Sequence, residues 1–227
     1  MFNGLLPGFL AISSLSFAEA PKIIFEENKN QWPSQVMYQA HIKGVSLFLE
    51  KNTFTYLFNE QRTIADHGTN TSDSAKIKFH SFKVEFQNSN ADVLVSGNNL
   101  LQGHRNYYRG NDPKKWAENV KLYGQVNYKN LYPSIDMTVY NAEENLKYDF
   151  IVNPGGNVKN IKLNYTGPDE MHLEYGHLYI KTSVGLIIEQ KPYAYQEING
   201  MQKKIACGYV LRNNTLSYDL GDYDHSL

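Results

Sequence analysis

The sequence predicts an all-β protein with an antiparallel, β-sandwich-like fold, and three observations support this prediction. Tyrosine and phenylalanine, which favour strands, are abundant, with 17 and 11 residues. Asparagine, a turn residue, occurs 24 times, whereas alanine, the strongest helix former, occurs only 11 times. Most apolar segments also alternate with polar residues at a period of two, which is typical of strands with one buried face.

Length, charge and cysteine content exclude several classes of protein. A chain of 227 residues is long enough for one large domain or two small ones, with a core that needs no disulfide or metal. The 22 basic and 23 acidic residues give a net charge of -1, which excludes a general nucleic-acid binder and an acidic disordered chain. The single cysteine excludes an intrachain disulfide and a cysteine-based zinc site.

The N-terminal segment is typical of a secretory signal peptide. Residues 1–18 carry no charged side chain, and both Ser16-Phe17-Ala18 and Ala18-Glu19-Ala20 fit a cleavage site. We therefore expect a signal peptide at 1–18, a β-rich domain at 21–227, and a location outside the cell or on its outer surface. No later segment approaches the roughly 18 apolar residues that a membrane-spanning helix needs, so the mature chain is not expected to span a membrane.

The first half of the domain contains two predicted hairpins. Alternating apolar residues place the strands of the first hairpin at 44–50 and 53–58. The same pattern places the strands of the second at 135–139 and 146–152, with a polar loop between them. Between 77 and 86 the apolar residues change phase, which predicts a β-bulge near His80-Ser81.

Two other segments of this half are predicted to be irregular. Asp112-Pro113 fits the N-cap and first position of a short helical turn that ends at Trp116. The polar stretch 59–76 is the predicted mobile loop.

From Val158 onward the sequence reads as a meander of short strands. Glycine-containing turns punctuate it, and Asn199-Gly200 predicts a type I′ turn with both residues at positive φ. This change of pattern suggests two β sub-modules, at 21–157 and 158–227. Cys207 lies in an alternating strand, and we interpret it as a small buried hydrophobe rather than a nucleophile.

The sequence contains no constellation that predicts catalysis, a cofactor or a metal ion. His172, Glu174 and His177 are close in sequence, but the Tyr175-Gly176 turn separates them, and we interpret them as polar residues of a solvated hairpin. The acidic pairs Glu26-Glu27 and Glu143-Glu144 cannot form a glycosidase pair within one strand, because adjacent side chains diverge. We therefore predict no catalytic, cofactor-binding or metal-binding residues.

Aromatic residues raise a second possibility, the binding of sugar rings. Tyr107-Tyr108 and the pair Tyr193 and Tyr195 could stack on a carbohydrate. Because Tyr193 and Tyr195 share a strand face, however, packing in the core is the simpler interpretation.

Five segments of the sequence are distinctive, namely FEENKNQWP (25–33), GNDPKKW (110–116), YKNLYPSID (128–136), LKYDFIVNPG (146–155) and KPYAYQ (191–196). These segments resemble a domain of unknown function found at the N-terminus of secreted Bacteroidetes-type surface proteins. The resemblance runs from about residue 23 to the end, with the segments in the same order and at similar spacing. Ser134 departs from it, because the family usually has glycine there.

The resemblance implies export and a place at the cell surface, often beside β-propeller-type (SBBP) repeats, PKD modules and a C-terminal sorting signal. It carries no established activity. The Asp, Pro and Gly residues of its motifs read as turn determinants, with Asp112 as a cap and Gly155-Gly156 at positive φ. The resemblance also implies Ser74, in Asp73-Ser74-Ala75, as a candidate for O-glycosylation.

The leading hypothesis is a secreted, non-catalytic β-module of a cell-surface or adhesin-like protein, whose partners are other surface modules or glycans. A carbohydrate-binding module that captures polysaccharide is the first alternative, and an exposed aromatic platform would favour it. An uncharacterised hydrolase is the second, and it would need converging carboxylates or a Ser/His pair in a cleft.

Overall fold

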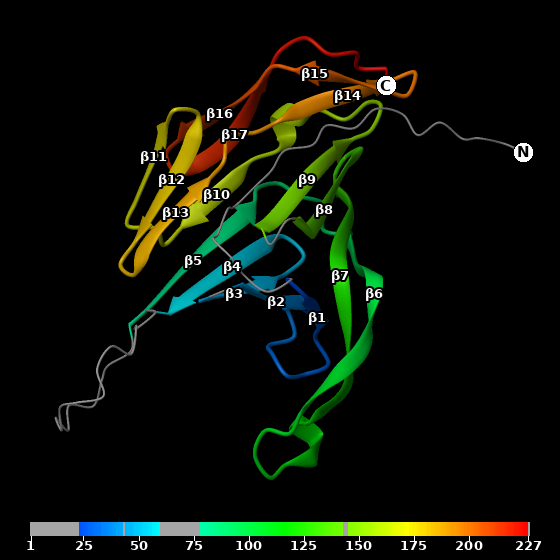
Figure 1. Cartoon of the computed structure of the whole chain (residues 1–227), viewed down its shortest axis with the longest axis vertical. Coiled ribbons are helices and arrows are strands. Elements are labelled where there is room, and N and C mark those ends of the chain that lie inside the picture. The colour runs from blue at the N-terminus through cyan, green and yellow to red at the C-terminus, as the bar shows by residue number, and fades with distance from the viewer. Residues whose placement is uncertain (1–22, 43, 60–77, 143–144, 227) are drawn as a thin grey trace, which may run out of the picture.

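The protein is all-β, as predicted (Figure 1). The structure, a computed structural model, describes residues 23–42, 44–59, 78–142 and 145–226. Twelve of its strands form one antiparallel sheet, in the order β16-β17-β10-β5-β4-β3-β2-β1-β7-β8-β9, with β6 paired to β7. These strands are β1 (Phe25–Glu27), β2 (Tyr38–Ile42), β3 (Val45–Leu49), β4 (Thr53–Asn59), β5 (Phe79–Phe86), β6 (Leu94–Tyr107), β7 (Ala117–Tyr132), β8 (Ile135–Ala142), β9 (Asn145–Val152), β10 (Leu163–Thr166), β16 (Cys207–Arg212) and β17 (Thr215–Leu220).

The remaining strands form two smaller units beside this sheet. One is a three-stranded sheet of β11 (Glu170–Glu174), β12 (His177–Thr182) and β13 (Gly185–Glu189). The other is a hairpin of β14 (Ala194–Ile198) and β15 (Met201–Ile205). Two short 3-10 helices, η1 (Pro113–Lys115) and η2 (Val158–Asn160), complete the described elements.

The core contains the apolar rows that the period-two pattern predicts. In the β3–β4 hairpin every second residue is buried, and its aromatic residues stack with those of β5. The β8–β9 hairpin buries the alternating row predicted for it, from Leu146 to Val152 on β9. Both predicted hairpins are therefore confirmed, because the alternation reflects one core-facing side of each strand.

The part of the chain after residue 157 joins the same sheet and core. β10 pairs with β5 on one side and with β17 on the other. The three-stranded sheet adds Leu178, Ile180 and Ile187 to the core, and the β14–β15 hairpin adds Ala194 and Ile205. Strands that lie far apart in sequence thus share one hydrophobic cluster.

Asparagine provides most of the left-handed backbone that the turns require. Among the described residues, eight of the ten non-glycine residues at positive φ are asparagines. Asn199 and Gly200 have φ values of 51° and 76°, so the predicted type I′ geometry is confirmed. The high asparagine content therefore reflects the number of tight turns in an all-β chain.

The prediction of a bulge at His80-Ser81 is wrong. β5 pairs with β4 residue by residue from Glu85 to Phe79, with no shift in register. Phe79 instead lies at the solvent-facing end of the strand, with its side chain exposed, so no phase change is needed.

The predicted helical turn is confirmed, because η1 begins after Asp112, whose side chain accepts a hydrogen bond from the Lys114 N–H at 3.1 Å. The predicted mobile loop at 59–76 lies almost wholly outside the described residues.

In the part of the chain that the structure describes, no helix has the length and apolarity needed to cross a membrane.

Candidate functional site

The outer part of the β6–β7 hairpin forms an arm that extends away from the rest of the molecule. The strands of this hairpin are 14 and 16 residues long, and they are the two longest of the described strands. In Figure 1 the two green strands run out together and end in the loop that carries η1. Among the described strands, β6 pairs only with β7, whereas β7 also pairs with β1 at Leu122 and Tyr123 and with β8 from Gln125 to Tyr132. The part of the hairpin beyond Leu122 is therefore the part that extends from the sheet.

A buried carboxylate fixes the base of the arm. Glu26, on β1, has a side chain that is 1% exposed. Its two carboxylate oxygens accept hydrogen bonds from the Arg105 guanidinium and from the Tyr107 hydroxyl, both on β6. A buried charge is tolerated only when it is paired and hydrogen-bonded, so these contacts favour one position of the arm relative to β1.

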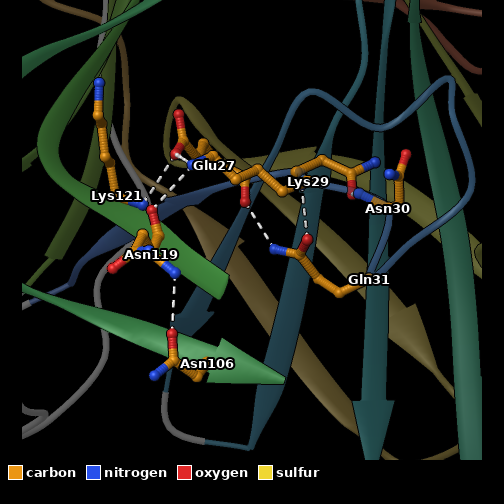
Figure 2. Close-up of polar contacts among 8 residues, drawn as sticks. Glu27, Lys29, Asn30, Gln31, Asn106, Asn119 and Lys121 are labelled. Carbon is orange, nitrogen blue, oxygen red and sulfur yellow. Dashed lines mark hydrogen bonds and ion pairs between the residues drawn. The ribbon is translucent and has the colours of Figure 1, made fainter. Parts of the chain in front are cut away.

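The residues that follow Glu26 contact the other strand of the arm (Figure 2). Glu27 accepts a hydrogen bond from the backbone N–H of Lys121 at 2.9 Å and pairs with the Lys29 ammonium at 3.5 Å. The Lys29 ammonium also donates to the carbonyl of Asn119 at 3.1 Å. Gln31 closes the loop on itself, because its amide donates to the Glu27 carbonyl and accepts from the Lys29 N–H, both at 2.6 Å.

A register shift interrupts the ladder of the arm where these contacts meet it. The register of β6 against β7 shifts between Arg105 and Tyr107. Opposite this shift, Asn119 adopts a positive φ of 54°, and its N–H donates to the Asn106 side chain at 2.8 Å. A bulge of this kind twists an edge strand, and here it directs Arg105 and Tyr107 towards the same buried carboxylate.

Aromatic and cationic groups continue the contact towards the tip. The ring of Trp32 packs edge-on against that of Tyr107, with centroids 5.8 Å apart. The Arg109 guanidinium lies 5.4 Å from the centre of the Tyr107 ring and donates to the Gln31 carbonyl at 3.1 Å. Two segments predicted from the family resemblance, 25–33 and 110–116, therefore lie at the base and the tip of one arm.

The arm tip, residues 108–116, combines exposed aromatic and basic side chains. Tyr108 is 57% exposed, and its ring meets that of Trp116 nearly at a right angle, with centroids 5.2 Å apart. The Trp116 indole donates to the Gly110 carbonyl at 3.1 Å, which closes the loop. Lys114 and Lys115 are exposed. With Arg109 they outnumber the one acidic residue of the tip, so this surface is basic on a chain of net charge -1.

The prediction that core packing explains Tyr193 and Tyr195 is wrong. On β14 the buried residues are Ala194 and Gln196, so the alternating tyrosines point outward. Tyr193 is 44% exposed, and its ring centroid lies 5.9 Å from that of Tyr195. The alternation of side chains along a strand correctly placed the two tyrosines on one face, but it did not specify which face of the strand meets the core.

A buried carboxylate that sequence analysis missed lies between the two larger sheets. Glu189, at the end of β13, accepts hydrogen bonds from the hydroxyls of Tyr165 at 2.9 Å and Tyr148 at 3.1 Å. Burial raises the pKa of Glu189 to about 7, although both hydrogen bonds act in the opposite direction. A signal was present in the sequence, because period two places Glu189 on the same face as the buried Ile187.

The residues of the histidine cluster contact other side chains and the backbone. The ring of His172 stacks on Tyr179, with centroids 5.2 Å apart, and Nδ1 of His177 accepts a hydrogen bond from the Lys191 N–H at 3.1 Å. Glu174 lies on β11 opposite His177. No group of three metal-ligating side chains occurs among the described residues.

Three other predicted features have different outcomes. The Cys207 thiol is half-buried against the core, and burial raises its pKa to about 12, as expected for an unreactive cysteine. Glu26 and Glu27 diverge, as predicted, and bind different parts of the arm. Ser74 and Glu143-Glu144 lie outside the described residues.

The turn residues of the other predicted motifs stabilise the β7–β8 turn. Ser134 adopts a positive φ of 57°, which explains why the resembling family usually has glycine there. The Asp136 carboxylate accepts hydrogen bonds from the Asn130 N–H at 2.7 Å and the Asn153 amide at 3.2 Å. Gly155 has the predicted positive φ, but Gly156 does not; a Cβ at Gly156 would lie 2.8 Å from the Ser134 carbonyl, so close packing requires glycine there.

Comparisons with known proteins show the family of this chain but no characterised relative. No curated protein and no solved structure matches the chain. A family model described as a domain of unknown function (DUF7948) matches residues 25–227, from the start of β1 to the end of the chain. The chain therefore belongs to the DUF7948 family.

Proposed function

We propose that this protein is a secreted, non-catalytic β-module of a cell-surface or adhesin-like protein, and that the arm tip is its contact surface. The observation that carries this proposal is the arm itself. A hairpin that extends from a packed sheet, with its base fixed by an ion pair to the buried Glu26 carboxylate and its tip exposed, presents a preorganised surface to a partner.

The acidic side chains described above support a non-catalytic role. The carboxylates of Glu26 and Glu27 are occupied by contacts to the arm. Glu189 has the raised pKa that a general acid needs, but it is 3% exposed and enclosed by tyrosines. None of these three carboxylates is presented to a substrate.

The proposal is tested by binding of the purified, fluorescently labelled domain to the surface of cells that produce it. The tip variant carries Tyr108→Ala, Lys114→Ala and Lys115→Ala, because these side chains are exposed and form none of the contacts at the base. The control carries Lys83→Ala and Lys162→Ala. These changes also remove two positive charges, but from exposed positions on and near the sheet.

We expect the control to bind as well as the wild-type domain and the tip variant to lose most of its binding. If binding of the wild-type domain weakens as the salt concentration rises, the lysine charges form part of the contact. Equal binding by all three proteins would contradict the role of the tip.

Export is tested separately by intact-mass measurement of secreted protein, where a retained Met1 would contradict processing near Ala18 or Ala20.

Carbohydrate binding is a second candidate function, and the outward position of Tyr193 and Tyr195 favours it. Exposed aromatic side chains on a sheet face offer flat apolar surfaces that pack against sugar rings. A polysaccharide would be captured by the module rather than hydrolysed by it.

A further inference from the structure

The strands β7, β8 and β9 carry a continuous band of polar side chains on the side that faces away from the core. Strand register places these residues in two rows across the three strands. The first row is Asn127, Thr138 and Asp149, and the second is Gln125, Tyr140 and Lys147. All six are half-buried. We call these two rows the outer sheet face.

Hydrogen bonds within β7 and between neighbouring strands hold the side chains of the outer sheet face in place. The Asn127 side-chain oxygen accepts hydrogen bonds from the Gln125 amide at 2.6 Å and from the Thr138 hydroxyl at 3.2 Å. The Tyr140 hydroxyl donates to the Asp149 carboxylate at 2.8 Å. Donors and acceptors that already sit on rigid strands lose little conformational entropy when a ligand binds.

Asp149 is the strongest acceptor of this face. Burial raises the pKa of its carboxyl, while the Tyr140 hydrogen bond and the Lys147 charge lower it. A partly desolvated carboxylate forms charge-assisted hydrogen bonds, which are stronger than neutral ones. Lys129 pairs with Asp136 at the next position along the strands, so positive and negative charges are interspersed rather than gathered.

Two outward tyrosines accompany this face, Tyr195 on β14 and Tyr193 directly before that strand. Tyr195 is within electrostatic reach of the face. Burial is the main cause that raises the pKa of Tyr195, and the Asp149 charge raises it further; burial and then Asp149 also raise the pKa of Tyr140, and Tyr195 adds to that effect. The Tyr193 ring lies beside that of Tyr195 at an angle of 40°. Lys204, opposite Tyr195 on β15, has its ammonium 5.6 Å from the centre of the Tyr193 ring.

We propose that the outer sheet face, together with Tyr193 and Tyr195, is a binding site for a neutral polysaccharide chain. The rows of amide, hydroxyl and carboxylate groups hydrogen-bond the sugar hydroxyls, and the tyrosine rings pack against the C–H faces of adjacent sugars. This inference rests on the carbohydrate-binding candidate and is independent of the arm tip.

The chemistry of the face favours a neutral glycan over other polymers. A nucleic acid or an acidic polysaccharide would place its negative charges against Asp149, without the cluster of positive charge that such ligands need. An apolar peptide would leave the carboxylate, amides and hydroxyls buried without enough partners, which is costly. A polyol matches the face, because every hydroxyl can both donate and accept.

The test uses the purified full chain and a panel of soluble polysaccharides, namely dextran, β-1,3-glucan, mannan, arabinoxylan and, as an acidic comparison, alginate. Affinity electrophoresis finds the polysaccharide that is bound, and calorimetry then measures the dissociation constant. The site variants are Tyr195→Ala, Tyr195→Phe and Asp149→Asn. The controls are Tyr175→Asn, at an exposed turn that tolerates positive φ, and Asp219→Asn, on the exposed side of β17.

We expect binding of a neutral polysaccharide to weaken at least about tenfold with Tyr195→Ala and with Asp149→Asn, because each removes a ring or a charge-assisted hydrogen bond. Tyr195→Phe, which keeps the ring, should bind more tightly than Tyr195→Ala, and both controls should bind like the wild type. Thermal melting verifies folding, and amide NMR shifts of the wild type should concentrate on β8, β9 and β14.

Two outcomes would overturn the proposal in different ways. Polysaccharide binding that survives both Tyr195→Ala and Asp149→Asn, with shifts elsewhere in the spectrum, would keep the carbohydrate-binding function and move the site. Failure of the wild type to bind any member of the panel, or binding of alginate alone, would reject a neutral polysaccharide as the ligand. Neither outcome bears on binding through the arm tip.

Discussion

Arg105 on β6 donates a hydrogen bond to the carboxylate of Glu26 on β1, 79 positions earlier in the chain. The two partners are buried to very different extents, because the side chain of Arg105 is 45% exposed and that of Glu26 is 1% exposed. The pair therefore stabilises the arm asymmetrically. An arginine that loses its partner can be hydrated, whereas a buried carboxylate cannot.

This asymmetry predicts unequal costs for the two single substitutions. Arg105→Ala, which leaves Glu26 buried without its cation, should lower the free energy of unfolding by about 3 kcal/mol. Glu26→Gln, which keeps a hydrogen-bonding group of the same shape, should lower it by only about 1 kcal/mol. Urea denaturation measures both, and equal losses would contradict the role assigned to burial.

The Glu189 carboxyl predicts a pH dependence of stability. Its pKa rises from 4.5 to about 7 on folding, so the native state binds more protons than the unfolded state between these values. The free energy of unfolding should therefore fall as pH rises from about 4.5 to 7, by about 3 kcal/mol in total, and should not fall further above that range on account of this group.

Glu189→Gln provides the control for this pH dependence, since glutamine has the same shape and cannot titrate; its amide oxygen accepts from one tyrosine hydroxyl and its NH2 can donate to the other. The difference in unfolding free energy between the wild type and this variant isolates the one carboxyl, because the other groups titrate in both. The variant should gain stability relative to the wild type as pH rises from 5 to about 8. A difference that stays constant with pH would show that Glu189 keeps an ordinary pKa in the folded protein.

Ser134 predicts a stabilising substitution. It occupies the third position of the Tyr132–Ile135 turn at a positive φ of 57°, a conformation that costs a residue with a Cβ about 1–2 kcal/mol. Ser134→Gly should therefore raise the free energy of unfolding by about 0.5–1 kcal/mol, after the greater flexibility of glycine in the unfolded chain is subtracted. Ser134→Ala is the matched control and should give no gain in a thermal melt.

Cys207 should react slowly with thiol reagents in the native protein. Burial raises its pKa to about 12, so almost none of the reactive thiolate is present at about pH 8. Labelling with a chromogenic disulfide should be slow in buffer and rapid in guanidinium chloride. Rapid labelling of folded protein would contradict the burial of the thiol.

The substitution Cys207→Ser should lower the free energy of unfolding by roughly 1–2 kcal/mol, because the hydroxyl would lie against apolar neighbours.

Several parts of the fold were predictable from sequence because they depend on neighbouring residues alone. The β3–β4 and β8–β9 hairpins follow from strict alternation on both sides of a short polar link. The Asn199-Gly200 turn follows from the ease with which these two residues adopt positive φ. The cap at Asp112 follows from a side chain that reaches a backbone N–H two residues away.

The elements that sequence analysis placed wrongly depend on choices that alternation leaves open. Period two identifies which residues share a face, but an amphipathic ring such as that of Tyr193 is compatible with either face. The burial of Ala194 in the core, and of Gln196 against the Asp224 backbone, decides the matter and turns Tyr193 and Tyr195 outward. The phase change before Phe82 likewise needs no bulge, because Phe79 tolerates exposure at a strand end.

By itself, the sequence determined the all-β class, the local turns and the membership of residues in strand faces, because each depends on short-range sterics and on hydrophobic alternation. Only the tertiary structure decided the partners of Glu26, the burial of Glu189 between two tyrosines, and the rows of polar side chains across β7, β8 and β9. The physical reason is that antiparallel strands can pair in many orders, and the order is chosen by long-range packing of all the faces at once.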